Sequence, residues 1–422
     1  MARKSMSLGR PFDRLFGSSL ASHISDGLLA TSAPLLATTL TKDPILIAGL
    51  SALVMLPWLL FGIPIGGLLD RIDRRKALAA AAIIKLSSAA ALSVAIATGS
   101  IHIWMLYVAS FLIGTAEVVS DTAIQSMLPQ LVKHEQIEKA NSRLNIAHTI
   151  LGNFIGTPLG GLLYAVAIWI PFAMNSLGFA IAAALVLLIP TAIKAEWNKA
   201  MIPPEREPST FWQDVKFGVK YLYEDKVLLR LVITTASIGF LFNVSTSTAI
   251  LYLLDVLKMP AAWFGIIMAI EGVASILGSI HAPKLSKRFG RSRMLAISIL
   301  FCCVATGAAG YVPNIWVFVP ISMIFQYLIS IWNILLMSTY HDMIPNHLFG
   351  RIHGTRRTLV WGLMPIGALI GGAIAQIDLR TPYLATLIIG TAIALFSFKF
   401  LKNLPQKKEE FLAEDNSALT IE

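Results

Sequence analysis

The stretch GGLLDRIDRRK, residues 66–76, is a short charged hinge between two long apolar segments. Glycines allow a helix end to approach a neighbouring helix closely, and Asp70 can pair with an arginine at that end. The arginine and lysine side chains of the hinge cannot be drawn through a lipid core. We therefore predict that the hinge lies on the cytoplasmic side of a membrane.

A similar hinge, GSIHAPKLSKRFGRSR, follows about half a chain later, at residues 278–293. Aligned at a spacing of 217 residues, three basic positions of the first hinge meet three of the second: Arg71 with Arg288, Arg74 with Arg291 and Lys76 with Arg293. The motif MLP at 127–129 likewise recurs as MIP at 343–345. These correspondences predict a duplicated membrane protein.

The composition indicates a chain that lies mostly in lipid, since 56% of its 422 residues are hydrophobic, only 14% are charged and the mean hydropathy is +0.70. A hydrocarbon core of about 30 Å requires about 20 apolar residues per spanning helix. We therefore predict an all-α membrane protein of twelve transmembrane helices, arranged as two pseudo-symmetric six-helix bundles. The predicted spans are residues 15–40, 45–69, 77–98, 104–128, 140–167, 170–193, 228–254, 261–282, 294–312, 315–340, 352–377 and 383–400.

The formal net charge of +10 is compatible with a nucleic-acid-binding protein, but the distribution of the charge favours a membrane topology. Of the 34 lysines and arginines, only Lys42, Lys258 and Arg380 fall in loops predicted to lie outside, and Lys85 falls within a span. All the others lie on the opposite side, as the positive-inside rule requires of cytoplasmic loops. We expect no nucleic-acid partner, both termini in the cytoplasm and a multi-pass location in a bacterial-type cytoplasmic (inner) membrane.

Residues 194–226 form a long polar stretch between the two halves. Thr210 and Gln213 fit a capping box, and the apolar stripe that follows predicts an amphipathic helix. This helix lies either on the inner leaflet or on the loops of the protein. The predicted domains are a first bundle (1–193), a cytoplasmic linker (194–226), a second bundle (227–402) and a cytoplasmic tail (403–422).

The fifth and eleventh predicted spans carry matching glycines and prolines. Gly156, Pro158, Gly160 and Gly161 of the fifth span have counterparts in the eleventh, which include Pro365. Glycines at four-residue spacing let helices approach closely, and a proline within a span leaves a kink. We predict that both halves kink the same helix, as in parallel repeats that rock against each other.

The two hinges resemble the loop between the second and third helices of major facilitator superfamily transporters, written Gly-x-x-x-Asp-Arg-x-Gly-Arg-Arg/Lys. Asp73 stands where the first copy would have its usual glycine, whereas the second copy keeps Gly290 and has Lys287 at the position of the acid. The resemblance implies that the hinge is a conformational motif in which Asp70 steadies the outward-open state. It assigns this role to Gly66, Asp70, Arg71, Arg74, Arg288 and Arg291.

The run GTPLGG at 156–161 resembles the Gly-Pro-x-x-Gly-Gly signature of antiporters in this superfamily, with its proline one residue later. The motifs LPW at 56–58, PQLV at 129–132 and ANS at 140–142, with the segment around Trp212, are similar to the exporter branch that includes the enterobactin exporter and the macrolide efflux pumps. The resemblance covers nearly the whole chain. It implies an exporter without indicating a substrate.

Ionisable side chains within spans are costly and usually face a water-filled cavity, so they are candidates for proton coupling. Glu117, Asp121 and Gln125 lie four residues apart on one helix face, and two neighbouring carboxylates in a low dielectric cannot both ionise cheaply. By family resemblance the first and fourth helices line the central cavity, which brings Asp26 to the same water. We predict that Asp26, Glu117 and Asp121 couple protons; alternatively, Asp121 and Gln125 are structural and pair with a nearby arginine.

Polar residues elsewhere in the spans are candidates for the substrate cavity. At a spacing of 216 residues Glu117 aligns with Asn333, so the second half lacks this acid. The candidates are His23, Gln125, Asn145, His148, Glu271, Gln326, Trp332 and Asn333. Hydrogen bonding between packed helices is the structural alternative, notably for His148 and Glu271.

Together these features predict a secondary active transporter that exports an amphipathic small molecule, a drug or a siderophore, in exchange for protons. The proton gradient supplies the energy, and we expect a monomer with no cofactor, metal ion or catalytic residue. The sequence has no His-Glu-x-x-His, phosphate-binding glycine loop or Gly-x-Ser-x-Gly motif that would indicate an enzyme. A lysophospholipid, metal or metal-chelate transporter is the alternative on the same fold, and a non-transporting membrane receptor is the alternative of another class.

Overall fold

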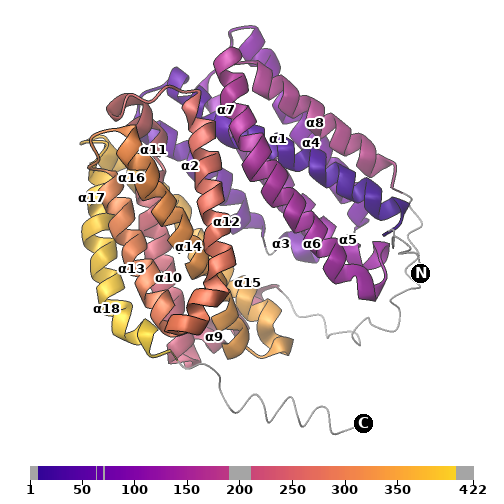
Figure 1. Ribbon diagram of the computed structural model, residues 1–422. Helices are drawn as coiled ribbons and strands as arrows, with labels where there is room; N and C mark the ends of the chain where they lie inside the picture. Colours follow the sequence, from indigo (N-terminus) through magenta and orange to yellow (C-terminus); the bar gives the residue numbers. More distant parts are fainter. Residues whose placement is uncertain (1–7, 63, 70–71, 190–210, 405–422) are drawn as a thin grey trace, which may run out of the picture. The chain divides into compact units, whose positions relative to one another are not determined.

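The computed structural model describes residues 8–62, 64–69, 72–189 and 211–404, which are helical and contain no strand (Figure 1). The helices before residue 190 are α1 (Arg10–Leu40), α2 (Pro44–Phe61), α3 (Pro64–Leu69), α4 (Arg74–Ala97), α5 (Ile103–Leu131), η1 (His134–Gln136), α6 (Ile137–Ala147), η2 (His148–Gly156), α7 (Thr157–Val166) and α8 (Ile170–Leu187). The later helices are α9 (Phe211–Glu224), α10 (Lys226–Thr246), α11 (Ala249–Leu251), η4 (Tyr252–Val256), α12 (Trp263–Phe289), α13 (Arg291–Ala309), α14 (Ile315–Met343), α15 (Asn346–Gly362), α16 (Met364–Ala375), α17 (Thr381–Ala385), η5 (Thr386–Gly390) and α18 (Thr391–Lys402).

Within the described residues, ten helices or helix runs are long and apolar enough to cross a membrane. They are Pro44–Phe61, Arg74–Ala97, Ile103–Leu131, Ile170–Leu187, Lys226–Val256, Trp263–Phe289, Arg291–Ala309, Ile315–Met343, Gly354–Ala375 and Thr381–Lys402. The other two predicted spans coincide with α1, which carries His23 and Asp26, and with the shorter apolar stretch Ile150–Val166. The prediction of an all-α membrane protein is confirmed, and the helices are consistent with twelve spans.

The chain divides into two compact units. Unit 1 comprises Met1–Ser209 with Lys258–Ala269, and unit 2 comprises Thr210–Leu257 with Ile270–Glu422. Most of the predicted linker and tail, residues 194–210 and 405–422, lie outside the described residues. The predicted domain boundaries therefore stay a prediction.

Helices α4 and α13, which follow the two hinges, begin in different ways at the same position of the repeat. Asp73 caps α4, because its carboxylate accepts hydrogen bonds from the backbone N–H groups of Arg75 at 2.9 Å and Lys76 at 3.3 Å. Gly290 precedes α13 with a φ of 87°, in the left-handed region that glycine adopts readily. The acid that replaces the usual glycine of the first hinge is thus a helix cap.

In unit 1, α1 packs against α8, η2 and α7, while α5 packs against α2 and α4. Glycines allow the close contact between α1 and the fifth predicted span, since Gly156 and Gly160 lie against the backbone of Ile24 and Leu28. Two hydrogen bonds fix the same helix: Thr31 Oγ1 donates to the carbonyl of Thr157 at 2.8 Å, and Asn175 Nδ2 of α8 donates to that of Ser25 at 2.5 Å. Helix α1 is therefore held from two sides.

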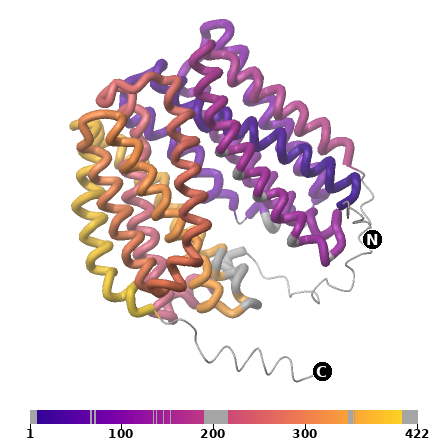
Figure 2. The backbone as a smooth tube through the Cα atoms, in the orientation of Figure 1, coloured from indigo at the N-terminus to yellow at the C-terminus, as the bar shows by residue number. Residues whose placement is uncertain are grey.

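In unit 2, α10 packs against α15 and α16, and α13 lies alongside α14 and α18 (Figure 2). The amphipathic helix α9 packs against α15, where Gly218 lies so close to Thr355 that a Cβ would meet its Oγ1 at 2.1 Å. Val219 and Tyr223 of α9 are exposed. Thr210 of the predicted capping box lies outside the described residues.

Helix boundaries coincide with both predicted proline kinks. The fifth predicted span consists of α6, the π-helical turn η2 and α7, with Pro158 in the first turn of α7. The eleventh is divided where α15 ends at Gly362 and α16 begins, with Pro365 in its first turn. Proline lacks the N–H that would continue the preceding helix, which accounts for the position of each boundary.

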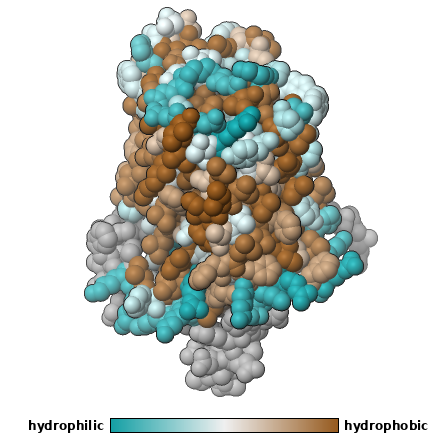
Figure 3. All heavy atoms as spheres, turned by 90° about the vertical axis from the view of Figure 1, so that its left-hand side faces the viewer, coloured by the Kyte–Doolittle hydropathy of each residue, from teal (hydrophilic) through white to brown (hydrophobic). Residues whose placement is uncertain are grey.

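Apolar side chains cover much of the surface. On the face shown in Figure 3, a brown apolar band lies between hydrophilic side chains at the upper and lower ends. Among the residues of unit 2, Phe396 is 90% exposed and Ile377 80%. Water-soluble proteins rarely expose a continuous apolar band, whereas a surface that faces the hydrocarbon core of a membrane requires one.

Candidate functional site

A cavity of 440 Å³ lies within unit 1, between α1, α2, α5, η2 and α7. Most of its lining is apolar and includes Val54, Met55 and Trp58 of α2. Four titratable side chains also line it: His23, Asp26, Glu117 and His148. A cavity of this size, largely apolar with a few polar groups, has the character of sites that bind small organic molecules.

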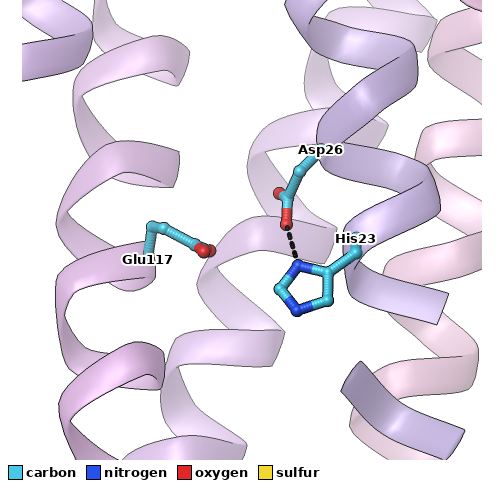
Figure 4. Close-up of side chains that lie close together, drawn as sticks. All are labelled: His23, Asp26 and Glu117. Carbon is cyan, nitrogen blue, oxygen red and sulfur yellow. Dashed lines mark ion pairs between the residues drawn. The ribbon is translucent and has the colours of Figure 1, made fainter. Parts of the chain in front are cut away.

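Figure 4 shows His23 and Asp26 of α1 facing Glu117 of α5. Nδ1 of His23 lies 3.8 Å from Oδ2 of Asp26, and Ser22 donates a hydrogen bond of 3.3 Å to the same oxygen. The side chains of Asp26 and Glu117 are each 28% exposed. Helices that are far apart in the sequence thus bring the two acids to one cavity.

Lys85 of α4 joins the two acids, although it was not among the predicted site residues. Its ammonium group donates hydrogen bonds to Glu117, to Oδ1 of Asp26 at 3.2 Å and to Oγ of Ser22 at 3.1 Å. The ring of Phe179 lies 5.1 Å from Nζ. The signal that would have identified Lys85 is its charge within a predicted span, because a charge in the membrane requires a partner.

The amine of this cluster is more deeply buried than the acids. The side chain of Lys85 is 2% exposed, and Lys85 is absent from the described cavity lining that includes Asp26 and Glu117. The two acids therefore separate the amine from the cavity, so that the cavity presents an acidic surface to a ligand.

The π-helical turn η2 places a second histidine at the cavity. The ring of His148 meets the ring of His23 edge-on, with centroids 4.8 Å apart. Such turns are rare and often occur at functional sites. Asn145, another cavity candidate, belongs to α6, but its side chain lies outside the described part of the structure.

His23, Asp26 and Glu117 are of the residue types that bind metal ions, and their ligand atoms lie within 4.8 Å of one another. A transition-metal ion needs its nitrogen and oxygen ligands about 2.0–2.2 Å from the ion. The ammonium group of Lys85 already binds both carboxylates, where it supplies the positive charge that an ion would bring. The expectation of no metal site stays a prediction.

Asp121 and Gln125 lie further along α5 and are absent from the described cavity lining. Gln125 donates a hydrogen bond of 3.4 Å from Nε2 to Oδ2 of Asp121. The i, i+4 spacing that grouped these residues with Glu117 therefore produces a local contact on the same helix. The role of Asp121 in proton coupling stays a prediction.

The cavity candidates of unit 2 lie in different environments. Glu271 of α12 is buried and accepts a hydrogen bond of 3.3 Å from Gln326 of α14. Trp332 is buried in the hydrophobic core of the unit, whereas Asn333 beside it is exposed. The contact between Glu271 and Gln326 is the helix-to-helix hydrogen bond considered as the structural alternative.

Corresponding hinge arginines contact the next helix in each half, through different groups. Arg74 donates to the carbonyl of Ser126 at 3.2 Å, and Arg291 pairs with Asp342. The guanidinium of Arg288 lies 5.2 Å from the centroid of the neighbouring Phe289 ring. Gly66 belongs to α3, and two further residues of the predicted motif lie outside the described residues: Asp70 and Arg71.

The chain resembles known exporters along most of its length. It is 21% identical over 405 residues to macrolide efflux protein A of Streptococcus pyogenes, a match that covers 94% of this chain and 98% of that protein. It is 24% identical over 348 residues to the enterobactin exporter EntS of Escherichia coli, covering 81% of this chain and 80% of the exporter.

Solved transporter structures share the fold. A bacterial homologue of the iron transporter ferroportin, in an inward-facing state, is similar with a TM-score of 0.72 and 14% identity, over 94% of this chain and 100% of that chain. The nucleoside transporter NupG is similar with a TM-score of 0.68 and 15% identity, over 94% and 100%. The family model of the Major Facilitator Superfamily matches residues 15–366. With this match over most of its length, the chain belongs to the Major Facilitator Superfamily and is a membrane transporter.

Proposed function

We propose that the protein is a proton-coupled antiporter that exports an amphipathic small molecule by alternating access. The observation that supports this function is the pair Asp26 and Glu117 on the wall of a cavity whose lining is otherwise mostly apolar. The apolar lining suits the body of an amphipathic molecule, and the carboxylates suit proton binding. Protons that enter would drive the molecule out.

The names of the relatives define the first substrates to test. A macrolide and the siderophore enterobactin are both large amphipathic molecules, and export is the activity named for both relatives. The positive-inside distribution supports cytoplasmic termini, and the bacterial sources of the relatives support a bacterial cytoplasmic membrane. We propose a monomer as the working unit, with the two hinges as conformational motifs.

Substrate-stimulated proton flux tests the proposal. The purified protein is reconstituted in liposomes that contain a pH-sensitive dye, and a macrolide, enterobactin or a lysophospholipid is added separately. We expect at least one of the three to stimulate proton flux, and we expect Asp26→Asn and Glu117→Gln to reduce that flux to the level of empty liposomes. Glu135→Gln is the matched control, because Glu135 is an exposed acid of the same unit.

The outcomes distinguish a failure of the proposed proton coupling from a failure of transport itself. Undiminished flux in Asp26→Asn and Glu117→Gln would contradict a coupling role for these acids. Transport of a substrate without any proton flux would show that the protein is a transporter that works by a mechanism other than proton exchange. Failure of every solute to enter by counterflow would favour the non-transporting receptor.

A further inference from the structure

The cluster around Asp26 in unit 1 combines two acids with one lysine and two histidines. Among the described residues, the groups around Asp26 that titrate or carry charge are His23 of α1, Lys85 of α4, Glu117 of α5 and His148 of η2. Helix α8, which packs against α1 and α4, has no ionisable residue. With neutral histidines and ionised acids, the cluster carries one uncompensated negative charge, which is costly in a low dielectric. The cluster therefore favours the uptake of one positive charge.

Lys85 cannot be the group that exchanges this charge. An ammonium group has three hydrogen-bond donors, and those of Lys85 are directed to Glu117, Asp26 and Ser22. The side chain is 2% exposed and is separated from the cavity by the acids. Release of a proton from Lys85 would leave two partly buried carboxylates without a counter-charge. Its positive charge is thus a permanent part of the site.

The two acids differ in their ability to hold a proton. Ser22 donates to Oδ2 of Asp26 at 3.3 Å, and a hydroxyl group can also accept, so Asp26 retains this partner when it is protonated. The ammonium group of Lys85 donates to both acids and has no acceptor, but it is the one partner that the described residues give Glu117, which is therefore stabilised in its ionised form. Asp26 is the better site for an exchangeable proton.

His23 is a poorer site for that proton. Its Nδ1 lies 3.8 Å from Oδ2 of Asp26, which is beyond hydrogen-bond distance. Its ring also packs edge-on against His148, so a charge on His23 would lie beside a second titratable ring. A carboxylic acid rather than an imidazolium is therefore the expected protonated state.

We propose that Lys85 is a fixed counter-charge that keeps Glu117 ionised, so that Asp26 alone binds and releases the exchanged proton. Lys85 is then a positioning residue that sets the number of exchanged protons at one. In each cycle a proton from solvent forms an O–H bond on the Asp26 carboxylate, and the same bond breaks when the proton returns to solvent. The inference rests on the proposed proton coupling and names its carrier, but its test requires no substrate.

Infrared difference spectroscopy of the purified protein tests the proposal, because a protonated carboxylic acid has a C=O stretching band that its carboxylate lacks. All variants are made in a Glu271→Gln background, since Glu271 is a further acid within a span and is buried. We expect one band that disappears as the pH rises. Labelling all aspartate carboxyl groups with heavy carbon should shift this band, and labelling the glutamate carboxyl groups should not.

Variants that change the charges of the cluster in pairs test whether Lys85 acts as a counter-charge or has only a structural role. Asp26→Asn and Glu117→Gln should each lose the band, because either change leaves one acid paired with Lys85. Lys85→Met should double the band by leaving both acids protonated, whereas Lys85→Arg should preserve the original band. Lys85→Met combined with Glu117→Gln should restore one aspartate band, and this variant remains informative if Lys85→Met alone does not fold.

Three results would overturn the proposal: a band that shifts with labelled glutamate, the absence of any titrating carboxyl band in the parent protein, or no band in the Lys85→Met/Glu117→Gln variant. Each is distinct from a failure of the proposed function, which is measured as transport. An aspartate band without proton-coupled transport would support the charge assignment and contradict only the antiporter.

Discussion

Gly27 of α1 shows how a single residue positions the cavity wall. A Cβ atom at Gly27 would lie 2.2 Å from the carbonyl oxygen of Gly152 and 2.8 Å from Cα of Gly156. Because these neighbours are backbone atoms, they cannot rotate away as a side chain would. Any side chain at Gly27 must therefore separate α1 from η2. The residue next to it in α1 is Asp26, which lines the cavity.

We expect Gly27→Ala to destabilise the protein by about 1–3 kcal/mol, the usual cost of overpacking. The measurement is thermal unfolding in detergent. Gly354→Ala is the control, because no described heavy atom beyond the neighbouring backbone of its own helix lies within 4 Å of the added Cβ, and alanine is the better helix former, by about 1 kcal/mol. Equal melting temperatures for the two variants would show that the close contact of α1 with η2 is dispensable.

The sequence predicted several residues of the site but not their partnerships. His23, Asp26, Glu117 and His148 were candidates because polar groups in spans are costly, and all four line the cavity. Lys85 was recognised only as a charge within a span, since its pairing depends on the rotation of α4 about its axis. Rotation of each helix is set by packing, which a single sequence without aligned relatives does not define.

At the scale of elements, the two hinges connect neighbouring helices through different contacts. Arg291 of α13 pairs with Asp342 of α14, and both side chains are about one-third exposed, at 31% and 30%. At the corresponding place in the first half, Arg74 of α4 donates to the carbonyl of Ser126 of α5. An ion pair this exposed contributes only about 0–1 kcal/mol to stability, so a conformational role would appear in the rate of transport.

We expect Asp342→Asn to lower the transport rate severalfold while changing the free energy of unfolding by no more than about 1 kcal/mol. Exchange of the two charges, Arg291→Asp with Asp342→Arg, should restore much of the rate. The measurements are initial rates in proteoliposomes and unfolding of the same preparations. A rate unaffected by Asp342→Asn would remove this pair from the conformational motif.

Element boundaries were predictable where a residue type enforces them. Pro158 and Pro365 indicated the breaks in the fifth and eleventh spans, and the observed boundaries lie beside both. The π-helical turn η2 was not predicted, because it depends on how the fifth span packs against α1 through its glycines. The sequence likewise left the position of the amphipathic helix open, and packing of α9 on α15 was found only in the structure.

At the scale of the whole molecule, the duplication preserves the architecture but not the charges. Asp26 and Glu117 belong to unit 1, and the corresponding positions of the second half are Phe242 and Asn333. The acid that is buried in unit 2, Glu271, occurs at a different position and bonds to Gln326. Comparison of the repeats therefore places the acids that we propose for proton coupling in one half.

The predicted topology is testable by cysteine labelling, because the two native cysteines are buried and free. Ser100 and Lys133 are exposed and lie in loops predicted on opposite sides of the membrane. In a Cys302→Ser/Cys303→Ser background, we expect a membrane-impermeant maleimide to label Ser100→Cys in intact cells. Lys133→Cys should react only after the cells are permeabilised, and the reverse pattern would invert the topology.

The buried amine of Lys85, behind the two acids, also determines how the membrane voltage contributes to the driving force for export. If Lys85 stays charged throughout the cycle, the cluster is neutral with its proton and negative without it. Exchange of one inward proton for one uncharged molecule then moves one elementary charge across the bilayer, which is worth about 2.3 kcal/mol per 100 mV. Export of an uncharged molecule would accordingly continue, driven by electrical potential alone, in cells whose internal and external pH are equal.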